Sequence, residues 1–141
     1  FEDKNIKLPE RKTKYSAGYD VEAAEDVTIP VFKPGVKPTL VKTGLKAYCQ
    51  EDEYYMLVNR SSNPGKKGLV LANSIGIVDS DYYGNESNDG HFMFAYYNFF
   101  DHEVQIKKGD VIGQVIFAKY YKVDDDKAEG IRTGGFGSTN K

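Results

Sequence analysis

Short stretches of alternating or β-branched apolar residues, separated by turn residues, recur along most of the chain. This pattern and the abundance of Tyr and Phe are typical of strands with one buried face. Helix patterns are scarce, and only Ser62 to Lys67, with capping side chains ahead of Pro64, predicts a helical turn or two. We therefore predict an antiparallel all-β domain, either a sandwich or a barrel. The strand-like stretches are 5–8, 19–23, 26–32, 39–49, 53–59, 68–79, 91–99 and 102–123.

The end of the chain loses this pattern. It is charged at first and then rich in glycine, a composition typical of a disordered terminus. We therefore divide the chain into one domain, residues 1–123, and a flexible C-terminal tail, residues 124–141. Phe136 stands among four glycines and argues against simple disorder, because a lone aromatic ring on a flexible strap is well suited to closing over a ligand.

Composition and charge exclude several classes of protein. A length of 141 residues suits a single domain, and a net charge of −2 gives no basic surface for nucleic acid or anionic membrane. The single cysteine, Cys49, excludes an internal disulfide and is expected to be a buried strand residue. His91 and His102 lack partners at metal-ligand spacing and are expected to lie at the surface or to make hydrogen bonds. The chain lacks an apolar stretch of roughly 20 residues and begins with a strongly charged segment, so we predict a soluble, cytoplasmic protein without a signal peptide.

The stretch GIVDSDYYG, residues 76–84, runs from an apolar strand directly into two carboxylates. Residues two apart in an extended chain point to the same side, so Asp79 and Asp81 would share a face and repel each other. Two explanations stay open. Either the strand ends at Asp79 and Ser80 begins a turn, or one carboxylate is held at a site.

Polar and glycine residues gather in five short stretches, each of which alone is weak evidence for a site. The second stretch combines an arginine fork with hydroxyl and backbone donors, the groups that hold phosphate. The stretches are SAGYD, NRSSNPGKKG, NSIGIVDSDYYG, GDVIGQVIF and RTGGFGST.

Taken together and in order, these stretches resemble the five motifs of the trimeric dUTP diphosphatases (dUTPases), over residues 16–139. The matching segments are 17–20, 60–68, 76–84, 109–117 and 132–138. The resemblance implies a jelly-roll-like β-barrel of the dUTPase type, with one short helical segment, assembled as a homotrimer. It also implies shared active sites. Each would combine the first, second and fourth motifs of one subunit, the third motif of another and the tail of the third.

The implied reaction is hydrolysis of dUTP to dUMP and pyrophosphate, which keeps uracil out of DNA and supplies dUMP for thymidylate synthesis. Asp79 would be the base that orients and deprotonates the water attacking the α-phosphorus. Tyr82 would pack under the deoxyribose and exclude a 2′-hydroxyl. Asp81 is expected to be structural, with its carboxylate paired with a neighbouring residue. Uracil would lie in a β-hairpin that runs from residue 75 to 82 and returns from 91 to 97, and main-chain groups would recognise it.

The remaining residues take their roles from the same resemblance. The residues that would hold the phosphates are Arg60, Ser61, Ser62 and Gln114. Asn73 would lie beside the base, although an asparagine there is as often a turn former. Phe136 would stack on uracil and Arg132 would reach the γ-phosphate. The remaining implied substrate contacts are Met93, Gly137 and Ser138. Mg²⁺ is the implied cofactor. Since Mg²⁺ typically binds substrate phosphates and keeps several waters, no direct protein ligand is expected, and Asp20 is the candidate for a contact through water.

Three departures from the family pattern limit this transfer. One residue, not two, separates Arg132 from the Gly-Gly pair, which puts in doubt which oxygen Arg132 reaches. Val111 stands where many members have arginine. Residues 85–90 lengthen the expected hairpin, and a plain solvated loop is favoured over an extra lid.

Two alternative functions stay open. A dCTP deaminase of the same fold would need an acidic residue that activates water at the base, and such enzymes usually lack this aspartate–tyrosine spacing. A nucleotide-binding regulatory relative is disfavoured by Asp79 and the complete tail motif.

Overall fold

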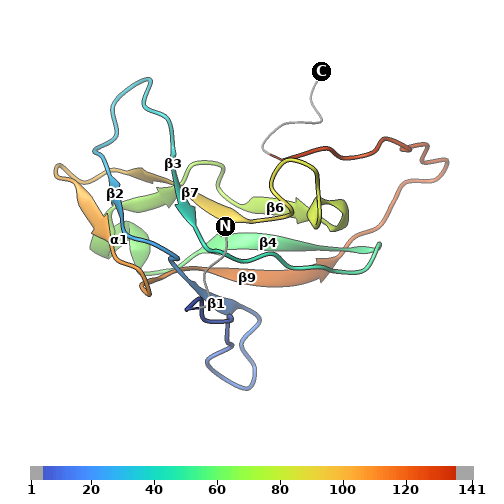
Figure 1. Cartoon of the computed structure of the whole chain (residues 1–141), viewed down its shortest axis with the longest axis horizontal. Helices are drawn as coiled ribbons and strands as arrows, with labels where there is room; N and C mark the ends of the chain where they lie inside the picture. Colours follow the sequence, from blue (N-terminus) through green and yellow to red (C-terminus); the bar gives the residue numbers. More distant parts are fainter. Residues whose placement is uncertain (1–4, 136–141) are drawn as a thin grey trace.

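The computed structural model describes residues 5–135 of the chain, and its regular secondary structure is almost entirely β-strand, joined by turns and loops (Figure 1). The elements are β1 (Tyr19–Glu22), β2 (Val27–Ile29), β3 (Thr39–Lys42), β4 (Glu53–Asn59), α1 (Asn63–Lys67), β5 (Leu69–Leu71), β6 (Gly76–Asp79), the 3-10 turn η1 (Ser80–Tyr82), β7 (Met93–Asn98), β8 (Val104–Ile106) and β9 (Val111–Lys119). The predicted all-β domain with one short helical segment is confirmed. Residues 5–8 form no strand, so that predicted stretch is wrong. Other predicted stretches are longer than the strands in them: only Thr39–Lys42 is a strand within residues 39–49, and the stretches 68–79 and 102–123 each contain two strands and a turn.

The strands pair antiparallel in three sheets, ordered β1-β9-β4-β6, β3-β7-β5 and β2-β8. In the described residues these ladders do not close into one ring. The two larger sheets face each other across a core that includes Tyr55 and Leu57 of β4 and Phe94 of β7, all buried. Packing is close at Gly113 of β9, where a Cβ atom would lie 2.3 Å from the Phe94 ring. The core is therefore continuous between the two sheets.

A polar bridge fixes the short helix against both sheets. The Tyr96 hydroxyl of β7 donates to the Ile112 carbonyl at 2.5 Å, and Asn63 Nδ2 donates to the same carbonyl at 3.0 Å. Ser62 makes no side-chain cap, so the predicted capping is wrong, and buried Asn63 anchors the first turn instead. Gly68 ends the helix with φ 65°, the left-handed conformation that glycine adopts without strain.

The outer face of the β1-β9-β4-β6 sheet is apolar along β4, β6 and β9. Ile77 of β6 lies opposite Met56 of β4, which in turn lies opposite Ile116 of β9. The Ile77 residue is 59% exposed, and Tyr54 and Val58 extend the same outward row of β4. A single chain thus leaves an apolar sheet face in contact with solvent.

The single cysteine and the two histidines all lie outside the strands. Cys49 lies outside the strands and is half-buried, so its expected place in a buried strand is wrong; its thiol donates to the Glu53 carbonyl at 3.4 Å. His91 makes hydrogen bonds and His102 lies exposed beside Asp101, as predicted. None of the helices in residues 5–135 is long and apolar enough to cross a membrane.

Candidate active site

The first, second and fourth motifs meet at one end of the large sheet. Gln114 of β9 lies between Asp20 of β1 and Val58 of β4. Val58 in turn precedes Arg60 by two residues. Arg60 Nη1 donates to the Val111 carbonyl of β9 at 3.3 Å. Gly18 makes room for Gln114, because a Cβ atom at Gly18 would lie within 2.1 Å of the Gln114 Oε1 atom. The structure therefore brings together the predicted phosphate-binding side chains and Asp20, and Ser61 and Ser62 follow Arg60 in the turn before α1.

The third motif lies at the opposite end of β4. Asp79 pairs with Tyr54 near the start of this strand, whereas Asn59 at its end pairs with Gly113 of β9. Tyr54 and Asn59 are five residues apart along β4, which is about 17 Å at the usual rise per strand residue. In one chain, the predicted base and the predicted phosphate-binding residues are therefore apart.

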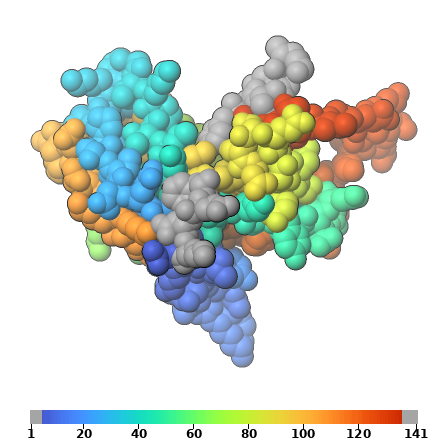
Figure 2. Space-filling view, in the orientation of Figure 1, coloured from blue at the N-terminus to red at the C-terminus, as the bar shows by residue number. Residues whose placement is uncertain are grey.

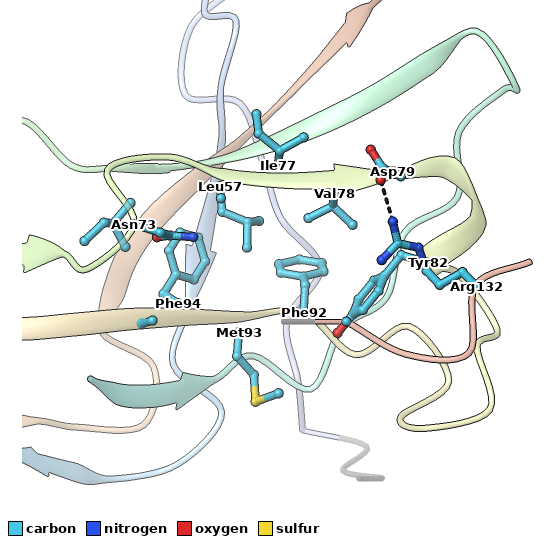
Figure 3. A pocket seen from close by; sticks show the side chains of 14 residues that line it. Leu57, Asn73, Ile77, Val78, Asp79, Tyr82, Phe92, Met93, Phe94 and Arg132 are labelled. Atoms are coloured by element: carbon cyan, nitrogen blue, oxygen red, sulfur yellow. Dashed lines mark hydrogen bonds and ion pairs between the residues drawn. The ribbon is translucent and has the colours of Figure 1, made fainter. Parts of the chain in front are cut away.

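A cavity of about 220 Å³ opens between β6 and β7 beside the third motif (Figure 3). Its walls are mainly apolar and come from Leu57, Val78, Phe92 and Phe94, with Asn73 near one end. The volume is below the usual range for sites that hold drug-sized ligands. It suits a single small ring.

The expected uracil hairpin is not a hydrogen-bonded pair of strands. β6 pairs with β4, whereas β7 pairs with β3 and β5, so the two segments lie in different sheets and form opposite walls of the cavity. Asn73 lies in the turn between β5 and β6, where its carbonyl accepts from the Ile75 amide at 2.7 Å. The Met93 side chain points away from the cavity (Figure 3), which leaves its main chain to line it.

The two carboxylates of the third motif share one guanidinium group. Arg132 Nη2 donates to Asp79 Oδ2 at 2.5 Å, and Arg132 Nε donates to Asp81 Oδ1 at 2.7 Å. The Arg132 side chain is only 16% exposed, whereas that of Asp79 is 55% exposed. The expected partner of Asp81 is therefore a residue of the tail. Asp79 also borders a second, more open hollow of about 520 Å³ beside Tyr54 and Tyr120.

The tail segment up to Gly135 lies against the third motif of its own chain. The Ser87 amide donates to the Thr133 carbonyl at 3.2 Å, and a Cβ atom at Gly135 would lie 2.5 Å from the Tyr82 ring. Figure 2 shows the red end of the described tail beside the yellow surface of the third motif and its following loop. Phe136, Gly137 and Ser138 lie outside the described residues, and the action of the tail on a neighbouring subunit stays a prediction.

The loop of residues 85–90 is not the plain solvated loop that we favoured from the sequence. Asn85 is buried, and its Nδ2 atom donates to the Tyr82 carbonyl at 2.7 Å. Asn88 Nδ2 donates to the Tyr82 hydroxyl at 2.7 Å, and this hydroxyl donates to the His91 carbonyl at 2.7 Å. Both asparagines were missed in the sequence analysis. Asparagine side chains often hydrogen-bond to the backbone of a turn, so the two asparagines in this loop could have predicted an ordered turn.

The donor groups near these motifs fit a magnesium ion held mostly by its substrate. In the part of the chain that the structure describes, no group of three or more Asp, Glu, His or Cys side chains is arranged to hold a metal ion. Asp20 is half-buried beside Gln114, so a single carboxylate faces the predicted phosphate-binding residues. One carboxylate is enough for an ion that keeps its waters and binds phosphate oxygens.

Comparisons with known proteins agree with the order of the motifs. The sequence model of the dUTPase family matches residues 4–140. A deoxyuridine 5′-triphosphate nucleotidohydrolase of Lactococcus lactis is 48% identical over 99% of this chain and 91% of its own length. The enzyme of the same name from Burkholderia mallei is 37% identical over 95% of this chain and 89% of its own length.

Solved structures also resemble this fold. The crystal structure of a Streptococcus mutans dUTPase has a TM-score of 0.80 and 43% sequence identity, and the match covers 88% of this chain and 93% of that chain. A mutant dUTPase from phage phi11 of S. aureus, which coordinates a structural Mg(II) ion, has a TM-score of 0.72. The phage match covers 92% of this chain and 94% of that chain, and at 20% identity it supports the fold alone.

Proposed function

Because the chain belongs to the dUTPase family, we propose that it hydrolyses dUTP to dUMP and pyrophosphate. The family match over residues 4–140 carries this proposal, together with 48% identity to a named deoxyuridine triphosphate nucleotidohydrolase. The predicted family and its jelly-roll-like fold are confirmed by these matches and by the Streptococcus mutans structure. The cytoplasmic location stays a prediction.

The cavity between β6 and β7 is the proposed uracil site. A cavity of about 220 Å³ accepts a pyrimidine ring but not a whole nucleotide, so the sugar and phosphates would extend past Tyr82 and Asp79. Residues of β6 and β7 border it. A fixed donor and acceptor pattern of their main-chain groups would reject a mismatched base at about 1–3 kcal/mol for each buried group left unpaired. Tyr82, at the end of the cavity (Figure 3), would pack under the deoxyribose.

Asp79 is the proposed general base. Asp79 borders both this cavity and the more open hollow beside Tyr54, so a water held by its carboxylate would lie between the uracil site and space for phosphates. In the described structure this carboxylate forms an ion pair with Arg132. A triphosphate would compete for the guanidinium group, because Arg forms bidentate pairs with phosphate as readily as with carboxylate. Binding of substrate would thereby release Asp79 to accept the proton of the attacking water.

Arg60, Ser61, Ser62 and Gln114 are the proposed phosphate-binding residues, and Asp20 the proposed contact to the water shell of Mg²⁺. When bound, Mg²⁺ would neutralise charge on the phosphates during in-line attack. The chain's own contribution is to hold Gln114 between Asp20 and Val58 on adjacent strands. This fixes the side chains on one surface of the sheet.

The proposed assembly is a homotrimer with shared sites. Two observations support it: the separation of about 17 Å between the levels of Asp79 and Asn59 along β4, and the apolar outer face around Ile77, Met56 and Ile116. A second subunit that covered this face would bury it. It would also bring the phosphate-binding end of one chain toward the base of another.

Turnover of four nucleotides tests the function. The protein is incubated with Mg²⁺ and dUTP, dTTP, dCTP or UTP, and pyrophosphate and ammonia are measured. Pyrophosphate from dUTP, with much slower release from the other three, is the expected result. Ammonia from dCTP would identify a deaminase instead. Nucleotide binding without either product would identify a regulatory relative.

A further inference from the structure

The loop of residues 85–90 encloses the hydroxyl end of Tyr82. Asn88 Nδ2 donates to the Tyr82 hydroxyl at 2.7 Å, and that hydroxyl donates to the His91 carbonyl at 2.7 Å. A phenol has one proton to donate, and here it is committed to the His91 carbonyl, while Asn88 Nδ2 donates both to the hydroxyl oxygen and, at 3.3 Å, to the same carbonyl. Tyr82 is a buried residue, 6% exposed, and its ring is thereby held at the hydroxyl end.

The loop holds Asn88 rigidly enough for this purpose. Asn88 Oδ1 accepts from Asn85 Nδ2 at 2.9 Å and from the Gly90 amide at 3.1 Å. Asn85 Oδ1 in turn accepts from the amides of Ser87 and Asn88. The loop is therefore ordered by its own side chains, and the orientation of the Asn88 amide is set by two donors to its oxygen.

Contacts outside the loop fix its position in the molecule. Lys46 pairs with Asp89 at 2.6 Å and lies 4.7 Å from the centre of the Tyr83 ring. Gly90 has φ 93°, and a Cβ atom there would lie 2.9 Å from the Tyr83 backbone. Only glycine fits at this turn, so the return of the chain toward β7 is fixed directly beside Tyr82.

We infer that Asn88 is a positioning residue that determines sugar selectivity. The inference rests on the proposed function, in which the Tyr82 ring fills the space of a 2′-hydroxyl. Exclusion by shape depends on a ring that cannot move aside, and Asn88 and the His91 carbonyl are the hydrogen-bond partners that hold its hydroxyl. Within residues 5–135, the hydrogen bonds of the Asn88 side chain go to the loop, to the Tyr82 hydroxyl and to the His91 carbonyl, and none goes to the proposed base or phosphate-binding residues. Asn88 therefore acts on the sugar through Tyr82.

Sugar selectivity of Asn88 variants tests this inference. The ratio of kcat/KM for dUTP to that for UTP is measured for the wild type, Asn88→Ala, Tyr82→Phe and the double variant. Each single variant is expected to lower the ratio by about two-fold to about ten-fold, the net worth of one hydrogen bond. The double variant should lower it no further than the larger single effect, because each change already removes the hydrogen bond between Asn88 and the Tyr82 hydroxyl.

Two further variants separate positioning from loss of structure. Asn88→Asp keeps an acceptor for Asn85 and Gly90 but removes the amide donor, so it should lower the ratio while the loop stays formed. Glu86→Gln, in the same loop and exposed, should keep the wild-type ratio. A purely structural role for Asn88 would lower turnover of dUTP and UTP in equal proportion. An unchanged ratio in both Asn88 variants, or additive effects in the double variant, would overturn the inference.

Binding of the products separates this inference from the proposed function. Calorimetry with dUMP and UMP measures sugar selectivity without turnover. If the wild type hydrolyses no dUTP but Asn88→Ala still lowers the preference for dUMP over UMP, the proposed function fails and the inference stands. If the wild type hydrolyses dUTP selectively and the Asn88 variants keep its selectivity in both assays, the inference alone fails.

Discussion

At the scale of single residues, a turn and an ion pair explain why the carboxylates of Asp79 and Asp81 lie so close together in the sequence. The strand ends at Asp79, and residues 80–82 form a 3-10 turn. Both carboxylates also meet the guanidinium group of Arg132, which offsets their repulsion. The sequence could predict the turn, because turn formation is local. It could not predict the pairing with Arg132, which lies 53 residues beyond Asp79 in the chain.

Substitution of Asp79 should separate the role of base from that of ion-pair partner. Asp79→Asn keeps the shape of the side chain but cannot accept the proton of water, so turnover of dUTP should fall by about 10²–10⁴-fold. Folding and dUMP binding should change little, since the side chain is more than half exposed. Steady-state kinetics and calorimetry provide the two measurements.

Asp81→Asn is the matched control. It removes one negative charge from the same arginine but, in the proposed mechanism, leaves the base in place. Its turnover should stay within about ten-fold of the wild type, the range expected for loss of a partly exposed ion pair. Equal losses in both variants would attribute the effect to the pairing with Arg132, and unchanged turnover in Asp79→Asn would remove that residue from the mechanism.

At the scale of elements, the sequence predicts strands well where the alternation of burial is strict. β4 spans Glu53–Asn59, as its pattern predicts, and β7 lies within the predicted residues 91–99. The pairing partners of β6 and β7 were not predictable in the same way. Which strand pairs with which is set by contacts between distant segments, and the expected hairpin assumed that neighbours in sequence pair with each other.

The loop of residues 85–90 illustrates the other limit of sequence reasoning. Its polar composition is that of a solvated loop, yet Asn85 and Gly90 are buried. Its order comes from side-chain amides that satisfy particular backbone groups. Such hydrogen bonds depend on the positions of Tyr82 and His91, and these are fixed only by the complete fold.

His91, which lies between the end of β3 and the start of β7, should make the free energy of unfolding depend on pH. His91 Nε2 accepts from the Gly44 amide at 2.9 Å and from the Thr43 amide at 3.3 Å. Burial, with a further contribution from the charge of Lys42 that outweighs the opposite effect of Glu25, lowers the pKa of His91 below its ordinary value. A histidine whose pKa is lower in the folded state takes up its proton more readily when unfolded, so stability rises with pH across the interval between the two values.

The expected result is a loss of stability as the pH falls from about 7 to about 5, through the ordinary histidine range. Urea unfolding at each pH measures it, and His91→Gln should show a weaker dependence in this window. His102→Gln is the control, because His102 is exposed and its hydrogen bond lowers the pKa of Asp101, which titrates at a more acidic pH. A dependence that is identical in His91→Gln and the wild type would contradict the assignment to His91.

At the scale of the whole molecule, the order of the five motifs predicts the family but not the place of each motif in space. The first, second and fourth motifs gather at one end of β4 and the third lies at the other. Periodicity and motif spacing carry no information about which end of a strand a neighbouring chain approaches. The described tail adds a second arrangement, since Arg132 pairs with Asp79 of its own chain. The proposed trimer therefore allows two arrangements, with base and tail acting either within one chain or between chains.

Mixing two inactive variants distinguishes these arrangements. One chain carries Asp79→Asn with an intact tail, and the other has a normal Asp79 but ends before Arg132. If base and tail act within one chain, each variant lacks one of the two at every site, and their mixture stays inactive. If a site takes its base and its tail from different subunits, about a quarter of the sites in randomly assembled trimers receive both functional parts. We expect dUTP turnover to rise toward this fraction of the wild-type value after subunit exchange.

Native mass spectrometry measures the trimer mass and the formation of mixed species. A chain with both changes, mixed with the Asp79→Asn chain, is the control that should show no recovery. A monomeric mass, or an inactive mixture in which mixed trimers are present, would contradict the shared site.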